Sequence, residues 1–142
     1  EPDLAFRERI VRQIRAYRPD IVITHDPFRP YALHPDHRAV GITTIDAVYP
    51  TARDPLYFPQ HLAEGLEPHK VAELWLFGAQ YPDLYVDISE TLDVKLAALA
   101  AHHSQMSAPE ELAARVRERA AEVGAERGIP YAEAFKVIAL RR

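Results

Sequence analysis

Two histidines, His34 and His37, are separated only by a proline and an aspartate in the segment HPDH. A third histidine, His25, and an aspartate, Asp26, stand shortly before them in the segment THDP. Imidazole and carboxylate groups are accepted zinc ligands, and they also often act as general acids and bases. These titratable groups, set densely beside stiffening prolines, therefore indicate a metal site, an acid–base site, or both.

Pro35 predicts where the helix that carries this segment begins. Proline is favoured as the first residue of a helix, because its missing N–H would have no partner there. His34 is then the N-cap, and His37 lies in the first turn and can face the same crevice. The positive end of the helix dipole disfavours an imidazolium ion, so a histidine there tends to stay neutral, as a metal ligand must. Asp36, in the same turn, is favoured as an anion and could orient a neighbouring imidazole.

Other interpretations of these residues are open. Histidine and aspartate are ordinary residues at the start of a helix, and His25 and Asp26 could simply end a strand. Alternatively, these two residues and the two histidines of HPDH form a local zinc site by themselves, since imidazoles and carboxylates are adequate ligands in type. Such a site requires the end of the strand and the start of the helix to converge within about 2.0–2.2 Å of one ion.

The rest of the sequence predicts the elements that must position these groups. Residues 4–17 have apolar residues at helical spacing from Phe6 to Tyr17, with arginine and glutamate on the other, solvent side. Residues 20–26 contain a continuous β-branched run that is typical of a buried parallel strand. The pattern then predicts a helix over 35–48, a long loop at the rim of the site over 50–70, strands over 71–77 and 84–89, helices over 89–103 and from 109 to about 124, and a short final strand. Alternating strands and helices predict a layered α/β fold with a mostly parallel sheet. In such folds the ligand crevice lies beyond the carboxyl ends of the strands, which is where HPDH stands.

The composition limits the kinds of site that the chain can form. The 142 residues, 48% of them hydrophobic, suit a single domain over residues 1–142. There is no cysteine, which excludes disulfides and thiolate metal sites. The net charge is −4 with scattered basic residues, so we expect no nucleic-acid partner, and no apolar run reaches the roughly 18 residues of a membrane span. No stretch resembles a signal peptide, and we expect a cytoplasmic protein.

Four segments occur along the chain in the order PDIVITHDP, HPDHRAVG, VDISETLDVKLAALAAHHSQ and YAEAF. Together they resemble the PIG-L/LmbE-like family of zinc-dependent N-acetylglucosaminyl deacetylases. The resemblance implies a Rossmann-like three-layer fold, Zn²⁺ or another divalent metal as the cofactor, and removal of the N-acetyl group from an N-acetylglucosamine-type amino sugar. It also implies that His37 is a metal ligand, that His34 stabilises the oxyanion or acts as an acid, and that Asp36 is an orienting group.

The chain departs from this family at one motif. The A-H-P-D-D-E motif of the family, which supplies two further zinc ligands and the general base, does not occur here. The chain begins at Glu1, and its only methionine is Met106. We therefore expect an incomplete, C-terminal part of such an enzyme, inactive by itself, which associates with the missing N-terminal half or forms homo-oligomers. The alternative is a degenerate, non-catalytic module that holds a sugar or a partner in the crevice.

The proline-rich loop 27–34, between the predicted strand 20–26 and the HPDH helix, contains two candidates for substrate binding. Tyr31, three residues before His34, could reach a small amino-sugar substrate, and Arg29 could meet a sugar hydroxyl or a phosphate. A tyrosine in such a loop can equally pack as part of a lid, and an arginine can simply be solvated.

Overall fold

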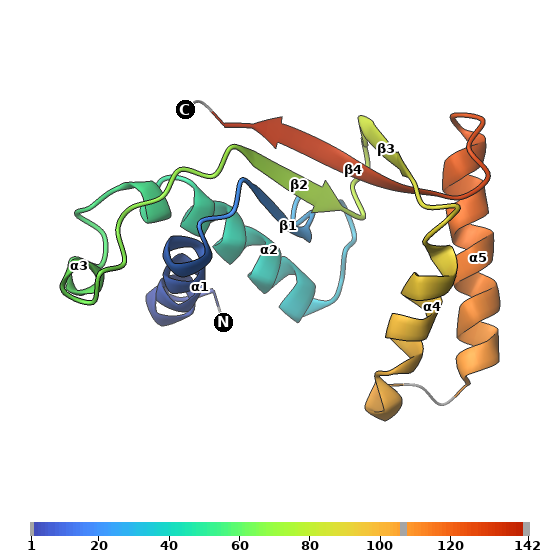
Figure 1. The fold of residues 1–142 in the computed structure, drawn as a ribbon, viewed down its shortest axis with the longest axis horizontal. Helices are drawn as coiled ribbons and strands as arrows, with labels where there is room; N and C mark the ends of the chain where they lie inside the picture. Colours follow the sequence, from blue (N-terminus) through green and yellow to red (C-terminus); the bar gives the residue numbers. More distant parts are fainter. Residues whose placement is uncertain (1, 106–107, 141–142) are drawn as a thin grey trace. The chain divides into compact units, whose positions relative to one another are not determined.

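The computed structural model describes residues 2–105 and 108–140. In chain order, its elements are α1 (Leu4–Tyr17), β1 (Ile21–His25), α2 (Pro35–Val48), the 3₁₀ turn η1 (Thr51–Arg53), α3 (Gln60–Ala63), β2 (Glu73–Phe77), β3 (Leu84–Asp87), α4 (Leu92–Ala100), the 3₁₀ turn η2 (His103–Gln105), α5 (Pro109–Ala125) and β4 (Ala132–Ala139). The chain divides into two compact units, one of residues 1–82 with 135–142 and one of residues 83–134 (Figure 1). Within the described ranges, none of the helices is long and apolar enough to cross a membrane.

The four strands form one sheet in the order β1-β2-β4-β3. β1 and β2 are parallel, with Ile23 opposite Trp75, whereas β4 runs antiparallel to β2. The layered α/β class predicted from the sequence is confirmed. The antiparallel direction of β4 was not predicted, because the apolar pattern of a strand does not encode its direction.

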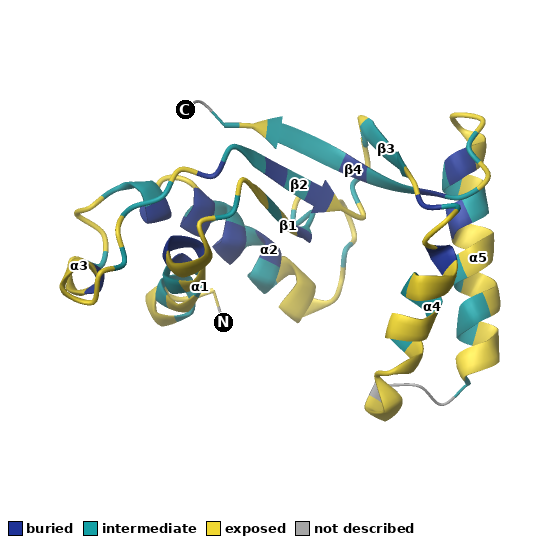
Figure 2. Cartoon of the chain, viewed as in Figure 1, coloured by how far each residue is buried: buried dark blue, intermediate teal, exposed yellow. Residues whose placement is uncertain are grey.

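In the first unit, α1 and α2 pack on one face of the sheet (Figure 1). Residues that point toward these helices are buried, including Leu74 and Leu76 of β2 (Figure 2). The buried core of this unit consists of Val11, Ile14, Ala47, Val48, Ala52, Val71, Leu74 and Leu76. Burial of this apolar surface holds the carboxyl end of β1 against the beginning of α2.

The other face of β1 is open. Ile21 and Ile23 alternate with Val22 and Thr24 along the strand, so they point away from α1 and α2. Their side chains are 42% and 52% exposed. β1 is also the outermost strand on its side of the sheet in the described part of the chain, so its outer backbone groups are free to pair.

The buried face of α1 differs from the predicted one. Tyr17 is 80% exposed, while Arg15, expected on the solvent side, is only 2% exposed. The Arg15 guanidinium donates to the carbonyl oxygens of five residues of the following segment: Thr51, Ala52, Asp54, Tyr57 and Phe58. It also lies 3.3 Å from Nδ1 of His61, which is fully buried. The buried Arg15 side chain therefore holds the segment after α2 in place through hydrogen bonds to its backbone.

The segment 50–70 does not lie at the rim of the HPDH site. α2 starts beside the end of β1 and runs back along the sheet, so its last residue, Val48, lies at the edge where the strands begin (Figure 1). The segment is held at that edge by hydrogen bonds from His69 to the carbonyls of Pro19 and Ala52. The predicted loop therefore contains the short elements η1 and α3, and it supports the opposite end of the sheet.

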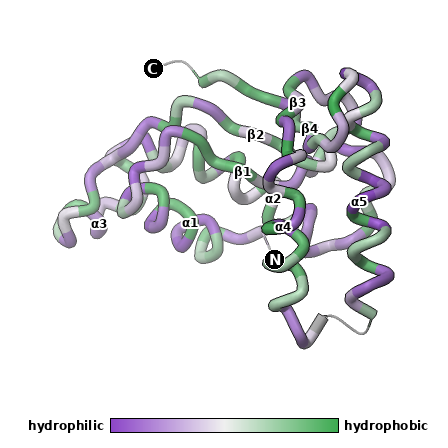
Figure 3. Tube along the Cα trace, turned by 45° about the vertical axis from the view of Figure 1, so that its right-hand side comes forward, coloured by the Kyte–Doolittle hydropathy of each residue, from purple (hydrophilic) through white to green (hydrophobic). Residues whose placement is uncertain are grey.

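The second unit contains α4, α5, β3 and the beginning of β4. Its small core is formed by Ile88, Leu92 and Ala120, and α5 alternates between hydrophilic and hydrophobic residues as an amphipathic helix does (Figure 3). Ser89, the first residue of the predicted helix 89–103, lies before α4, because the helix begins only at Leu92 and the Ser89 hydroxyl accepts a hydrogen bond from the backbone of Tyr131. Gln105 is the last residue of the segment VDISETLDVKLAALAAHHSQ, and its side chain lies outside the part of the chain that the structure describes.

We expect Arg15→Met to lower the free energy of unfolding by about 3 kcal/mol, because the substitution keeps the bulk but leaves several buried acceptors without a donor. Urea denaturation at a fixed protein concentration measures this. Arg9→Met, at an exposed position of the same helix, is the matched control and should change the value by less than about 0.5 kcal/mol. Equal effects of the two substitutions would contradict the role assigned to Arg15.

The stability of this region should also depend on pH through His61. Burial lowers the pKa of His61 below its ordinary value of 6.5, assisted by the charge of Arg12 and opposed by the hydrogen bond to Glu8. The unfolded chain then binds more protons than the folded chain below about pH 6.5, so this stability is complete above that pH and is lost on acidification.

We expect the unfolding free energy to fall between pH 7.5 and pH 5.5, and to fall less in His61→Gln. His103→Ala, which removes an exposed histidine of the second unit, should keep the full pH dependence. An unchanged pH dependence in His61→Gln would show that His61 is not the titrating group.

Candidate functional site

The HPDH segment opens α2 as predicted. Pro35 is the first helical residue, and His34 is the N-cap, with Nδ1 accepting a hydrogen bond of 3.2 Å from the backbone N–H of Asp36. Since Nδ1 is an acceptor, the proton of neutral His34 is on Nε2. The first turn of α2 is exposed (Figure 2), so the Nε2–H group of His34 is available to a ligand.

Three imidazole rings from the end of a strand and the start of a helix form a stack, and the ring of Phe77, at the end of the neighbouring strand, lies tilted by 50° against the first of them. The ring centroids are 4.2 Å apart between Phe77 and His25, 4.1 Å between His25 and His37, and 4.2 Å between His37 and His34. The three imidazoles are nearly parallel, with angles of 12° between neighbouring rings. His37 is the middle imidazole, so one neighbour covers each face of its ring and its edge is left open.

The surroundings of His25 disfavour a charge on its ring. The pKa of His25 is lowered from its ordinary value, first by burial and then by the proximity of His37 and His34. His25 therefore stands in the stack as a neutral ring.

A glycine allows α2 to come this close to β1. A Cβ atom added at Gly41 would lie 2.7 Å from the carbonyl oxygen of His25 and 3.1 Å from Cβ of Pro27. Both obstacles belong to the backbone or to a proline, so neither can move aside easily. Gly41 is one helical turn after His37, and the close approach therefore brings the ring of His37 onto that of His25.

The loop between β1 and α2 is fastened at several points. Asp26 accepts a hydrogen bond from the backbone of Phe28 at 2.9 Å, and its own N–H donates to the carbonyl of Phe77. Arg38 donates to the carbonyls of Ala32 and Leu33 at 2.8 and 2.6 Å. The loop is therefore tied both to the end of β2 and to the first turns of α2.

The two candidate substrate residues lie in this loop. Arg29 is exposed and donates to the carbonyl of Gly78 at 3.4 Å, so it links the loop to the segment after β2. Tyr31 is 93% exposed and has a positive φ of 61°, a conformation that costs a non-glycine residue energy. The structure places neither side chain in the ring stack.

The described residues offer an ion one ligand at the stack rather than a complete set. The lone pair of an imidazole lies in the plane of its ring, so two nearly parallel stacked rings cannot both aim at one ion about 2.0–2.1 Å away. Within residues 2–105 and 108–140, no group of three or more His, Asp or Glu side chains could hold a metal. A local zinc site made only of His25, Asp26, His34 and His37 is therefore not formed. The open edge of His37 fits one coordination position.

Sequence reasoning missed two contributors to this site. Phe77 was predicted as part of an apolar strand, and its ring lies against His25. Gly41 is the last residue of the segment HPDHRAVG, and no structural role was predicted for it. A signal for Phe77 existed in the parallel pairing of the two strands, because residues at the carboxyl ends of neighbouring parallel strands come together.

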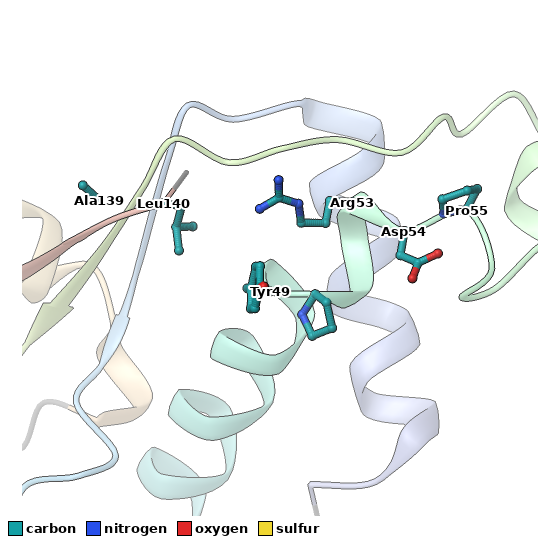
Figure 4. A pocket seen from close by; sticks show the side chains of 7 residues that line it. Tyr49, Arg53, Asp54, Pro55, Ala139 and Leu140 are labelled. Atoms are coloured by element: carbon teal, nitrogen blue, oxygen red, sulfur yellow. The ribbon is translucent and has the colours of Figure 1, made fainter. Parts of the chain in front are cut away.

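The first unit also contains a cavity of about 640 Å³ away from this site (Figure 4). It is lined by Tyr49, Pro50, Arg53, Asp54, Pro55, Ala139 and Leu140. The Arg53 guanidinium lies 5.3 Å from the centroid of the Tyr49 ring, and none of the stacked rings lines the cavity. The cavity lies at the edge where β1 and β2 begin, opposite the end that carries the stack.

The chain is similar to known deacetylases. It is 41% identical over 106 residues to the diacetylchitobiose deacetylase of Thermococcus kodakarensis, which covers 75% of this chain and 39% of that protein. It matches the structure of the N,N'-diacetylchitobiose deacetylase of Pyrococcus horikoshii, solved with an inhibitor, with a TM-score of 0.88, 29% identity and 98% of this chain covered. The chain is therefore homologous to these enzymes, and it spans about 39% and 53% of their respective lengths. No protein-family profile matches the chain.

More distant structures share the fold alone. A 4-carboxy-2-hydroxymuconate hydratase of Pseudomonas putida matches with a TM-score of 0.72 and 22% identity, covering 99% of this chain and 60% of that one. A conserved protein of Thermus thermophilus matches with a TM-score of 0.73 and 24% identity, covering 99% of this chain and 61% of that one. Because a hydratase has the same fold, the fold by itself does not specify deacetylation.

Proposed function

We propose that this chain is part of a PIG-L/LmbE-like, metal-dependent amide hydrolase that removes the N-acetyl group from an N-acetylglucosamine-type amino sugar. One observation carries the proposal. In a chain 41% identical over 106 residues to a diacetylchitobiose deacetylase, the HPDH turn presents two exposed, stacked histidines, His34 and His37, beside the carboxyl end of a strand. The carboxyl end of a strand is where α/β folds place their ligands.

Zinc, or another divalent metal, is the cofactor we propose, with His37 as one of its protein ligands. The exposed ring of His37, with its edge left open by the two stacked neighbours, suits this role. When bound, such a metal lowers the pKa of a coordinated water to about 7 and so provides a nucleophile at neutral pH. The remaining ligands and the general base come, in this proposal, from a part of the polypeptide outside residues 1–142.

His34 is the candidate for stabilising negative charge on the substrate. Its Nδ1 is engaged as the helix cap, so its proton is held at Nε2 in the exposed first turn. From there it can donate to the amide oxygen as that atom becomes negative, or to the departing amine. Asp36 donates its backbone N–H to Nδ1 of His34 and so fixes the orientation of that ring. Asp36 is therefore the proposed orienting group of the site.

Tyr31 and Arg29 are the proposed substrate contacts. Both are exposed in the loop that leads into HPDH, and Arg29 is oriented by its bond to Gly78. The strained backbone of Tyr31 holds its side chain in solvent, where an aromatic ring can pack against the apolar face of a sugar. The substrate class we favour is N,N'-diacetylchitobiose and related N-acetylated sugars.

The protein at its natural length should release acetate from N,N'-diacetylchitobiose and contain bound zinc in a stoichiometric amount. His37→Ala should lose both the zinc and the activity. His34→Ser keeps an oxygen acceptor at the N-cap and should keep the zinc, but kcat should fall about 10²–10³-fold, the loss typical when one donor to an oxyanion is removed. Acetate release and metal analysis measure these quantities.

His103→Ala, which removes an exposed histidine of the second unit, is the control and should retain zinc and activity. A protein of natural length with neither zinc nor acetate release would instead support a non-catalytic sugar- or partner-binding module. Activity that survives His37→Ala unchanged would exclude the proposed metal site.

The open face and free edge of β1 support an association of this chain with further polypeptide. Ile21 and Ile23 are large, apolar and half exposed, and the homologous deacetylases are longer than this chain. Covering this surface would remove apolar area from water and pair the free backbone groups of the strand. We propose that the remainder of the polypeptide covers it, and that copies of the chain do so when residues 1–142 are isolated.

Light scattering of residues 1–142 should therefore give a mass above the 16.1 kDa of one chain. Ile23→Lys should shift the mass toward that of the monomer. Leu56→Lys, at a more exposed apolar position in the segment after η1, should not. A monomeric chain of 16.1 kDa that unfolds cooperatively would contradict the proposed association.

A further inference from the structure

The histidine that the proposed function requires as a ligand is oriented in an unusual way. A ligating imidazole is normally held by a hydrogen bond from its second nitrogen to a carboxylate or a carbonyl. In the described part of the chain, no such bond to a ring nitrogen of His37 is found. Its contacts are instead the two parallel rings of His25 and His34. The orientation of His37 therefore depends on ring stacking.

The two neighbours of His37 differ in how firmly they are held. His34 is the N-cap of α2 and is exposed, as the proposed ligand His37 is. His25 belongs to a strand, is partly buried, and has the ring of Phe77 behind it at 4.2 Å. The residue after it donates its N–H to the carbonyl of Phe77 at 3.0 Å, which continues the pairing of the two strands. His25 is therefore the fixed side of the stack.

The approach of α2 to β1 sets how closely the rings meet. The backbone carbonyl of His25 occupies the position that faces Gly41, where any larger residue would collide with it at 2.7 Å. The helix thus rests directly on the backbone of the strand, and the rings of His25 and His37 meet at 4.1 Å. Contact between backbones defines this distance more rigidly than contact between flexible side chains would.

We propose that His25 is a positioning residue, whose ring, supported by Phe77, fixes the plane in which His37 presents its nitrogen to a bound ion. The position of His37 follows from this chain alone, and only the use of that nitrogen as a ligand rests on the proposed function. His25 acts through its flat shape rather than its own nitrogens. A phenyl ring at position 25 therefore replaces it, and an aliphatic side chain of similar volume does not.

The test uses the protein at its natural length, with histidine labelled for NMR and without metal or substrate. The ring protons of His37 should show the upfield shift expected of a ring sandwiched between aromatic rings. His25→Phe should keep that shift, and His25→Leu should lose much of it. The assignment is made with His37→Ala, and His103→Ala is the control that leaves the signals in place.

Affinity for Zn²⁺ alone gives the second measurement. His25→Leu should weaken zinc binding about 10–100-fold, as loss of an orienting group does, while His25→Phe stays close to the original protein. Loss in both variants would show that a nitrogen of His25 is needed and would overturn positioning by stacking. No loss in either variant, with unchanged His37 signals, would overturn any role of His25.

Gly41→Ala tests the same geometry from the helix side without changing an aromatic ring. Alanine usually stabilises a helix interior relative to glycine. Here the added Cβ must push α2 away from the strand, so the signals of His37 should move and zinc binding should weaken. An unchanged His37 spectrum in this variant would overturn the inferred geometry. The NMR result does not depend on acetate release, so this inference and the proposed deacetylation can fail separately.

Discussion

The direct contact between the backbone of α2 and the end of β1 is the constraint on which the site depends. It exists because residue 41 has no side chain, which allows the helix to rest on the carbonyl oxygen of His25. From this contact follows the 4.1 Å distance between the rings of His25 and His37. The chemistry proposed for the site thus rests on a packing distance between two backbones.

Different interactions hold the opposite end of the sheet, where β1 and β2 begin. There the buried guanidinium of Arg15 donates hydrogen bonds to the carbonyl groups of the segment after α2 and to Nδ1 of neutral His61. Since Nδ1 of His61 accepts from Arg15, its Nε2–H points to the carboxylate of Glu8, 3.3 Å away. This polar cluster holds the segment that follows α2, whereas the contact at Gly41 holds the helix itself against the carboxyl end of β1.

Sequence rules that depend only on neighbouring residues correctly predicted where α2 begins. Pro35 and His34 occupy the first helical position and the N-cap because the geometry of a helix terminus depends on only a few neighbouring residues. The layered α/β class followed from the alternation of strand and helix patterns. The identities of the metal ligand and the substrate contacts stay predictions.

What the sequence did not reveal depends on contacts between distant residues. Arg15 looked like a solvent-facing residue of an amphipathic helix, and only the carbonyl groups of residues 51–58 make its burial favourable. The segment 50–70 was assigned to the rim of the site because its prolines suggested a loop, but its place follows from the direction in which α2 runs. The contact between the rings of Phe77 and His25 could be predicted only from the register of the two strands, which no local pattern gives.

The most direct test of the central claim is a crystal structure of the protein at its natural length grown with zinc, with an anomalous difference map at the zinc edge. The account predicts a peak about 2.0–2.1 Å from a ring nitrogen of His37, in the plane of that ring, with the other protein ligands supplied from outside residues 1–142. A zinc peak elsewhere, with the His37 ring turned out of the stack and away from the ion, would contradict it.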